Sequence, residues 1–256
     1  MPDSDLPETG TAIRSADVAE TSDASEASDM PQPYRAILWD MDGTLSDSEP
    51  LHYASLVAAL RHFGEEPDAA LHAQTFGMTG RASYEFCVTR YGRAFDFATW
   101  SQVRFETFIA SLEQLRAREG ALELCRAAQR AGLYQAVVSN AGRNTLESGI
   151  AALALGEYLT VAVCAHDVTA GKPAPDGYLL AAERLGVTPA QAVVVEDSPL
   201  GAQAGVAAGM RVVAWLEAGS DPGLYPEAAQ IVRTSKQLAE ALGLAIDDPA
   251  EAPGVV

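Results

Sequence analysis

The sequence predicts an α/β fold in which helices cover both faces of a parallel sheet, with an all-helical segment inserted after the first strand. Short, continuous apolar runs alternate with segments of helical period along most of the chain. Continuous apolar runs are typical of strands buried on both faces, and their alternation with helices is typical of βαβ units. Only the stretch 50–117 departs from this alternation, because it holds helical patterns and no convincing strand.

The individual elements follow from these patterns. Strands are predicted at 36–39, 135–139, 160–164, 192–196 and 211–215. Helices are predicted between them at 120–131, 144–155, 176–185 and 199–208. Each helix is expected to end near a glycine, the residue type that most often closes a helix, at Gly132, Gly156, Gly186 and Gly209.

The chain is expected to comprise four parts. The α/β core covers 34–49 and 118–245, and the helical cap covers 50–117. Residues 1–33 contain eight acidic residues against one basic residue, Arg14, and few large apolar ones. Such a segment cannot bury enough surface to offset its ordering entropy, so we expect a disordered acidic tail, followed at the other end by a short flexible tail at 246–256.

The composition restricts the class of partner. A formal net charge of −18 argues against nucleic acid or an anionic membrane surface, although a local site can still bind a small anion. The three cysteines are far apart and show no metal-binding spacing. No apolar run reaches the length of a membrane span, and a signal peptide is not evident, so we expect a cytoplasmic protein. The sequence does not indicate an oligomeric state.

Polar side chains follow four of the predicted strands. They are Asp40, Asp42, Gly43, Thr44, Ser139, Asn140, Lys172, Glu196 and Asp197. Ligands of open α/β sheets bind outside the carboxyl ends of the strands, so these residues should line one crevice. Four acids in one crevice repel each other unless a cation lies among them, and oxygen ligands without His or Cys favour Mg²⁺. A lysine, hydroxyls and the backbone amides from Gly43 onward could then hold a phosphoryl group.

Asp40 and Asp42 can divide the chemistry of phosphoryl transfer between them. One carboxylate attacks phosphorus and forms an aspartyl-phosphate. The other protonates the leaving alcohol and later deprotonates water, so its pKa should lie above that of its partner.

At this point the sequence resembles the haloacid dehalogenase superfamily, in the branch with a helical cap after the first strand. The DxDGT motif reads Asp40-Met41-Asp42-Gly43-Thr44, followed in order by Ser139 in VVSN, Lys172 in GKPAPD and Glu196-Asp197 in VVVEDS. The resemblance covers about residues 34–245. It implies a Rossmann-like core of three layers, with a parallel sheet between two layers of helices and an inserted all-helical cap.

The resemblance also implies a role for each motif residue. Asp40 is expected to be the nucleophile and an Mg²⁺ ligand, and Asp42 the general acid/base, with its backbone carbonyl on the metal. Ser139 and Lys172 are expected to act in catalysis as phosphate ligands. The groups expected to bind the phosphoryl group are Gly43, Thr44, Ser139, Asn140 and Lys172.

The last motif completes the expected metal site. Asp197 is expected to be an Mg²⁺ ligand, and Glu196 either binds the metal or braces Lys172. The cofactor implied is Mg²⁺, and the partner implied is a small phosphorylated metabolite.

Simpler interpretations exist for several of these residues. Asp40 and Asp42 could belong to an ordinary turn, and Ser139 with Asn140 could cap the following helix.

Four further polar residues are left open or set aside. Arg81 and Arg143 could contact substrate or lie on the surface. His52 and His166 have no partner at metal-ligand spacing and are interpreted as structural.

The function expected is that of a phosphatase acting on a small phosphorylated metabolite, with a sugar phosphate as the favoured class. The main alternative is a phosphosugar mutase resembling β-phosphoglucomutase, which has the same core motifs. A non-catalytic binding protein on the same fold is the remaining alternative, although none of the expected catalytic acids is missing.

Overall fold

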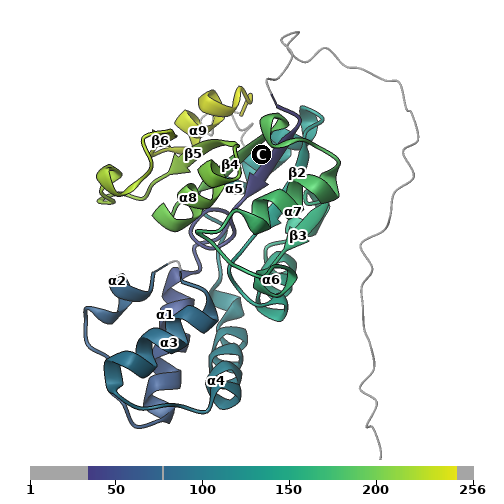
Figure 1. The fold of residues 1–256 in the computed structure, drawn as a ribbon. Coiled ribbons are helices and arrows are strands. Elements are labelled where there is room, and N and C mark those ends of the chain that lie inside the picture. Colours follow the sequence, from purple (N-terminus) through teal and green to yellow (C-terminus); the bar gives the residue numbers. More distant parts are fainter. Residues whose placement is uncertain (1–33, 77, 247–256) are drawn as a thin grey trace, which may run out of the picture. The chain divides into compact units, whose positions relative to one another are not determined.

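The computed structural model describes residues 34–76 and 78–246. A sheet of parallel strands lies at its centre, in the order β3-β2-β1-β4-β5-β6 (Figure 1). The strands are β1 (Ala36–Trp39), β2 (Tyr134–Val138), β3 (Val161–Val163), β4 (Ala192–Glu196), β5 (Arg211–Trp215) and β6 (Ala229–Val232). The predicted strands are confirmed, with ends that differ from the prediction by no more than one residue.

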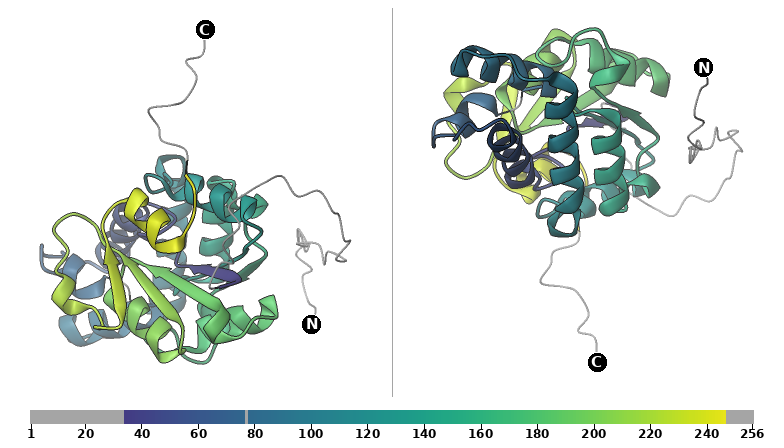
Figure 2. Two further views of the ribbon diagram at one scale, coloured as in Figure 1. Left: turned by 90° about the horizontal axis from the view of Figure 1, so that it is seen from above. Right: turned by 90° about the horizontal axis from the view of Figure 1, so that it is seen from below.

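Helices cover both faces of this sheet, as Figure 2 shows in its left view. They are α5 (Ala121–Arg130), α6 (Arg143–Ala152), α7 (Asp176–Leu185), α8 (Pro199–Ala207) and α9 (Ser235–Leu242). Successive strand residues point to opposite faces, so Ile37 and Trp39 join an apolar cluster with α5, α6 and α9. Leu38 joins a second cluster with α7 and α8. The predicted three-layer parallel fold is therefore confirmed.

Strand β6 was not predicted from the sequence. It lies at the edge of the sheet and pairs only with β5. Its four residues AQIV include the exposed residues Gln230 and Ile231. An edge strand needs less apolar surface than a central one, so β6 lacks the continuous apolar run that predicted the other strands.

The glycine signals predicted three of the four helix ends. Gly132, Gly186 and Gly209 have φ angles of 71°, 67° and 72° and follow α5, α7 and α8. The expectation for Gly156 was wrong, because α6 ends at Ala152 and the residue with positive φ is Ala154, at 53°. The sequence contains no signal for a left-handed alanine, since its side chain disfavours this conformation.

The segment between β1 and β2 is helical, which confirms the predicted all-helical insert. Its helices are α1 (Glu49–His62), α2 (Leu71–Thr75), α3 (Gly80–Tyr91) and α4 (Phe97–Ala110). They share an apolar cluster that includes Leu60, Cys87 and Trp100 and is separate from the two clusters on the sheet. The side chains of Thr79 and Asp96 accept hydrogen bonds from backbone N–H groups in the first turns of α3 and α4.

The two chain segments that join the insert to the sheet lie side by side. The Asp47 N–H donates to the Arg116 carbonyl (2.9 Å), and the Arg118 N–H donates to the Leu45 carbonyl (3.1 Å). The proposed limits of the cap, 50–117, lie next to these two hydrogen-bonded segments. Residues 1–33 and 247–256, on which the predictions of tails fall, lie outside the described residues. In the part of the chain that the structure describes, no helix has the length and apolar character needed to cross a membrane.

A buried glutamine links the strands β1 and β2 to α5. Gln135 is 1% exposed, accepts from Trp39 Nε1 (3.0 Å) and donates to the Cys125 carbonyl (3.0 Å). We expect Gln135→Leu to lower the free energy of unfolding by about 1–3 kcal/mol, because it leaves buried polar groups without partners. Urea unfolding measures this change. Gln230→Leu on the exposed edge strand is the control, with an expected change within about 0.5 kcal/mol, and equal effects of the two substitutions would contradict the prediction.

Candidate active site

The strand order brings the predicted site residues to one edge of the sheet. Strands β2 and β3 lie on one side of β1. Strands β4, β5 and β6 lie on its other side. The order therefore reverses between β1 and β4, and ligands of open α/β sheets bind at such a point. Asp40 follows β1, Ser139 follows β2, and Asp197 follows β4.

Lys172 joins two of these carboxylates. Its Nζ lies 2.5 Å from Asp40 Oδ1 and 2.5 Å from Glu196 Oε1, and it donates to the Val138 carbonyl at 2.8 Å. Burial alone would lower the pKa of Lys172, but the charges and hydrogen bonds of Asp40 and Glu196 raise it above its usual value. The buried side chain therefore carries a full positive charge between two acids.

Glu196 has both carboxylate oxygens engaged. Its Oε1 accepts from Lys172 Nζ and from the Tyr178 hydroxyl (2.8 Å). Its Oε2 accepts from the Ser198 N–H (3.1 Å) and hydroxyl (3.0 Å). Gly201 lets this side chain fit, because a Cβ on Gly201 would lie 1.7 Å from Glu196 Oε1.

Asp197 is oriented by the turn that follows β1. The Thr44 hydroxyl donates to Asp197 Oδ1 at 3.0 Å. Gly43 has a φ of 90°, and a Cβ there would lie 2.1 Å from Asp197 Oδ2. Only glycine satisfies both the backbone conformation and this close approach.

Asp40, Glu196 and Asp197 could hold a metal ion between them. One carboxylate oxygen from each lies within 4.8 Å of the others, and all three residues are buried. Burial and the neighbouring Glu196 raise the pKa values of Asp40 and Asp197 well above the usual range. Three carboxylates without His or Cys fit a hard cation such as Mg²⁺, which would offset their repulsion. The Asp42 carboxylate is not part of this group.

Asp42 lies in a different environment. Its Oδ1 is 2.7 Å from the Ser48 hydroxyl and 2.8 Å from His52 Nε2, and its Oδ2 accepts from the Ser139 hydroxyl at 3.0 Å. Burial alone would raise the pKa of Asp42, but the charge of His52 and these hydrogen bonds outweigh burial and lower it. The expected order of the two pKa values is thus reversed, because Asp40 lies among acids and Asp42 lies among donors.

Ser139 and Asn140 contact the site instead of capping a helix. Helix α6 has Gly142 as its N-cap and no side-chain cap, so the capping interpretation was wrong. Ser139 contacts Asp42, whereas Asn140 Oδ1 accepts from the Lys172 N–H at 2.9 Å and its Nδ2 donates to the Lys172 carbonyl at 3.3 Å. Asn140 therefore holds the loop that carries the lysine.

The backbone amide expected at Gly43 is engaged inside the turn, where it donates to the Ser46 carbonyl at 2.8 Å. The Thr44 hydroxyl is committed to Asp197. Neither group is directed at a phosphoryl group in this arrangement. Among the described residues, the backbone N–H groups of Met41, Asp42 and Thr44 have no acceptor, so they are the donors that this turn leaves for a ligand.

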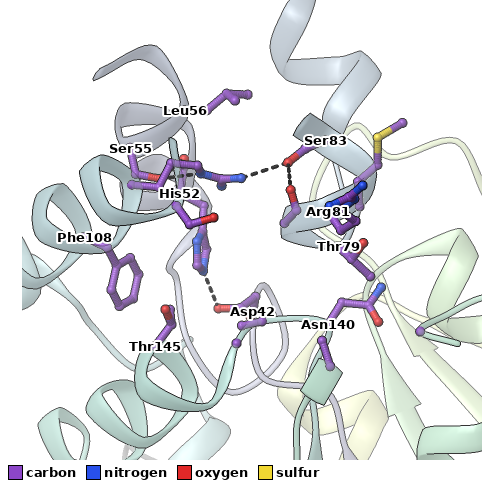
Figure 3. A pocket seen from close by; sticks show the side chains of 18 of the residues that line it. Asp42, His52, Ser55, Leu56, Thr79, Arg81, Ser83, Phe108, Asn140 and Thr145 are labelled. Carbon is purple, nitrogen blue, oxygen red and sulfur yellow. Dashed lines mark hydrogen bonds and ion pairs between the residues drawn. The ribbon is translucent and has the colours of Figure 1, made fainter. Parts of the chain in front are cut away.

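A cavity of about 900 Å³ lies between the carboxyl edge of the sheet and the helical insert. Asp40, Asp42 and Lys172 line it from the sheet, and residues of α1, α3 and α4 line it from the insert. In Figure 3 His52 reaches from the insert to Asp42. Its ring stacks on Phe108 of α4, with centroids 4.8 Å apart.

The structural interpretation of His52 therefore missed a contact with the site. Ligand spacing could not reveal it, because the partner is a carboxylate and not a metal. A signal was present in the position of His52, which lies in the first turn of the helix that follows the DxDGT turn.

The two arginines left open by the sequence also line this cavity, but each has partners in the protein. Arg81 Nε donates to Glu85 Oε1 at 2.7 Å, and its guanidinium lies over the Phe97 ring. Arg143 pairs with Asp167 (2.5 Å) and Glu147 (3.4 Å). Whether either contacts substrate stays a prediction.

Known proteins share both the sequence pattern and the fold. The model of the haloacid dehalogenase-like hydrolase family matches residues 34–209. Fructose-1-phosphate phosphatase YqaB of Escherichia coli (strain K12) is 33% identical over 196 residues, which cover 72% of this chain and 97% of that protein. Hexitol phosphatase A of the same organism is 34% identical over 183 residues, covering 70% of this chain and 82% of that protein.

A solved structure supports the same assignment. The crystal structure of CbbY from Rhodobacter sphaeroides in complex with phosphate aligns with a TM-score of 0.71 at 26% identity, and the alignment covers 80% of this chain and 96% of that one. The match of the family model spans more than half of the chain, and the fold agrees. The chain therefore belongs to the haloacid dehalogenase-like hydrolases and is an enzyme of that family.

Proposed function

We propose that this hydrolase is an Mg²⁺-dependent phosphatase that cleaves a sugar phosphate or a similar small phosphorylated metabolite through an aspartyl-phosphate on Asp40. The observation that carries the proposal is the pair of environments after β1. Asp40 lies in a buried cluster with Lys172, Glu196 and Asp197, whereas Asp42 lies outside that cluster and is held by separate donors. This separation supports covalent chemistry on one acid and proton transfer on the other.

In the first step an oxygen of the Asp40 carboxylate attacks phosphorus, and the bond from phosphorus to the ester oxygen breaks. Asp42 gives a proton to the departing alcohol. Since three donors hold Asp42 in its ionised form here, it must take up a proton and loosen these contacts before this step. The ammonium of Lys172 lies within 2.5 Å of Asp40 and is placed to neutralise charge on the phosphoryl oxygens.

In the second step water attacks the phosphorus of the aspartyl-phosphate, Asp42 takes a proton from that water, and the Asp40 carboxylate and inorganic phosphate are released. The ionised form of Asp42 that its donors favour is the form needed here. Asp40 and Asp197 would hold Mg²⁺, with the Asp42 carbonyl as a further ligand. The cation would supply positive charge for the phosphoryl oxygens. Glu196 is better suited to brace Lys172, because both of its oxygens accept hydrogen bonds.

The substrate class is supported by the relatives and by the cavity. Two of the relatives are named as phosphatases of fructose 1-phosphate and of hexitol phosphates. A cavity of about 900 Å³ exceeds the space that a phosphate ion needs and lies within the range of small-molecule sites. The helical insert contributes much of its lining, so we propose that the insert selects the organic part of the substrate.

Hydrolysis of p-nitrophenyl phosphate tests the proposed chemistry. We expect turnover with Mg²⁺, loss of turnover with EDTA, and a decrease of roughly 10⁴-fold or more in Asp40→Asn, which removes the nucleophile. A panel of sugar phosphates, followed for free phosphate and for isomerised product, separates a phosphatase from a mutase. Isomerised product without free phosphate would favour the mutase. Unchanged turnover in Asp40→Asn would contradict the covalent mechanism.

Binding of Mg²⁺ should release protons. The pKa values of Asp40 and Asp197 are raised, so part of the acidic cluster is protonated at a pH where an ordinary carboxyl is ionised. A cation binds the ionised form, so the apparent affinity should increase as the pH rises above the range in which an ordinary carboxyl titrates. Calorimetry in two buffers of different ionisation enthalpy measures the protons released. Asp197→Asn should weaken binding, and binding that is independent of pH would contradict this prediction.

A substitution at Gly201 tests the proposed role of Glu196 in holding Lys172 in place. We expect Gly201→Ala to displace Glu196 from Lys172, to lower turnover, and to reduce the free energy of unfolding by roughly 2–5 kcal/mol, because it disturbs a buried ion pair. Gly156→Ala is the matched control, since a Cβ there meets nothing within 4 Å. Equal stability and activity of the two variants would argue against a requirement for this brace.

A further inference from the structure

One arginine of the insert lines the cavity without an acidic partner. Arg104 lies on α4 and lines the same cavity as Asp40 and Asp42. Its Nε donates to the Ser55 hydroxyl of α1 at 3.3 Å, and its Nη1 donates to the Ser83 hydroxyl of α3 at 2.8 Å. In Figure 3 Ser55 and Ser83 lie on the side of the cavity opposite Asp42.

The two serines hold the guanidinium through their lone pairs. The Ser55 hydroxyl donates its proton to the His52 carbonyl (2.7 Å), and the Ser83 hydroxyl donates to the Gly80 carbonyl (3.0 Å). Both hydroxyls therefore face Arg104 as acceptors. A guanidinium has about five N–H donors, and these contacts use only the Nε–H and one Nη1–H. The remaining N–H groups have no acceptor among residues 34–76 and 78–246.

The charge of Arg104 is also not neutralised by a contact. No carboxylate in the described ranges lies within 4.0 Å of it, whereas Arg81 and Arg143 each have such a partner. Glu49, the acid that acts on Arg104 from a greater distance, has its own partner in His72 at 2.7 Å. A partly buried cation without a counter-ion is costly unless an anion binds to it.

A second donor of the same helix lacks an acceptor. Trp100 lies one turn before Arg104 on α4, is 1% exposed and lines the same cavity. Its Nε1–H is the buried side-chain group in the described part of the chain that has no hydrogen-bond partner. Residues four apart share a helix face, so the indole and the guanidinium are neighbours. The Nε1 atom is covered in this structure, so an oxyanion bound to Arg104 would also accept from it once the covering side chains shift.

We propose that Arg104, with the Trp100 N–H beside it, binds a carboxylate or a second phosphate at the end of the substrate remote from the reacting phosphoryl group. This inference rests on the proposed phosphatase function and narrows its substrate class to phosphate esters with a second anionic group. A guanidinium that offers several N–H groups recognises either oxyanion. The sugar chain between the two anionic groups would occupy the cavity between the sheet and the insert.

Binding to the Asp40→Asn protein tests the inference without requiring turnover. Two pairs of ligands differ only in the remote group. In the first pair 6-phosphogluconate carries a carboxylate where sorbitol 6-phosphate carries a hydroxymethyl group. In the second pair fructose 1,6-bisphosphate carries a phosphate where fructose 6-phosphate carries a hydroxyl. Calorimetry with Mg²⁺ should show tighter binding of the member with the second anionic group in at least one pair, and the pair that responds identifies the oxyanion.

Variants in the same background assign this preference to Arg104. We expect Arg104→Met to reduce the preference by roughly 10- to 100-fold while changing only slightly the affinity for the member that lacks the second anionic group. Arg104→Lys should retain part of it, and Trp100→Phe should reduce it by a smaller factor. The matched control is Arg90→Met in α3, which removes a cation paired with Asp68 away from the cavity. It should leave the preference unchanged.

The outcomes separate this inference from the proposed function. Equal binding of both members of each pair by the Asp40→Asn protein would overturn the inference, whether or not the Arg104 variants fold. An equal loss for both members in Arg104→Met would also overturn it, since it would reveal a purely structural link between α1, α3 and α4. Failure of the wild-type protein to release phosphate from p-nitrophenyl phosphate and from every sugar phosphate of the panel would overturn the phosphatase function, while a preference for ligands with a second anionic group would still support the Arg104 site.

Discussion

The contact of Lys172 with Asp40 and Glu196 is the interaction on which the rest of the site depends. Three buried acids within a few ångströms of each other would repel strongly in a medium of low dielectric constant. The ammonium reduces this repulsion and links Asp40 after β1 and Glu196 at the end of β4 to the loop before α7, which carries Lys172. Because Asn140 holds the backbone of Lys172 and Ser198 holds Glu196, the position of the charge is fixed from several directions. The charged groups at the edge of the sheet are thus held in place before substrate binds, and such preorganised charge favours phosphoryl transfer.

The short turn after β1 gives the two neighbouring acids different surroundings. Residues two apart on a strand share a face, so Asp40 and Asp42 would meet the same environment if β1 continued. The turn closes instead through Gly43, whose positive φ brings Asp197 against the backbone while Asp42 is directed towards Ser139 and His52. The surroundings of Asp40 therefore raise its pKa, whereas those of Asp42 lower its pKa.

The sequence predicted the parts of this arrangement that depend on chain order. The parallel strands and the acids at their ends follow from local patterns and from a general rule about sheet edges. The edge strand β6 was missed, because Gln230 and Ile231 interrupt its apolar pattern. The roles of His52 and Arg104 were also missed, since both depend on how helices of the insert pack over the sheet. The order of the two pKa values depends on donors from two separate segments, Ser48 and His52 at the start of α1 and Ser139 after β2, and no local pattern shows that these segments meet.

The apolar cluster of the insert is separate from the two clusters that flank the sheet. A substitution at the lining of α3 therefore leaves the packing around β1 and β4 intact, and with it the placement of the acids, whereas Phe108 of α4 stacks on His52, which contacts Asp42. The enzyme can accordingly acquire a new substrate range through a few changes in one part of the chain, at little risk to the reaction that it performs. Such a division makes the scaffold adaptable over evolutionary time, and it offers a natural starting point for redesigning specificity.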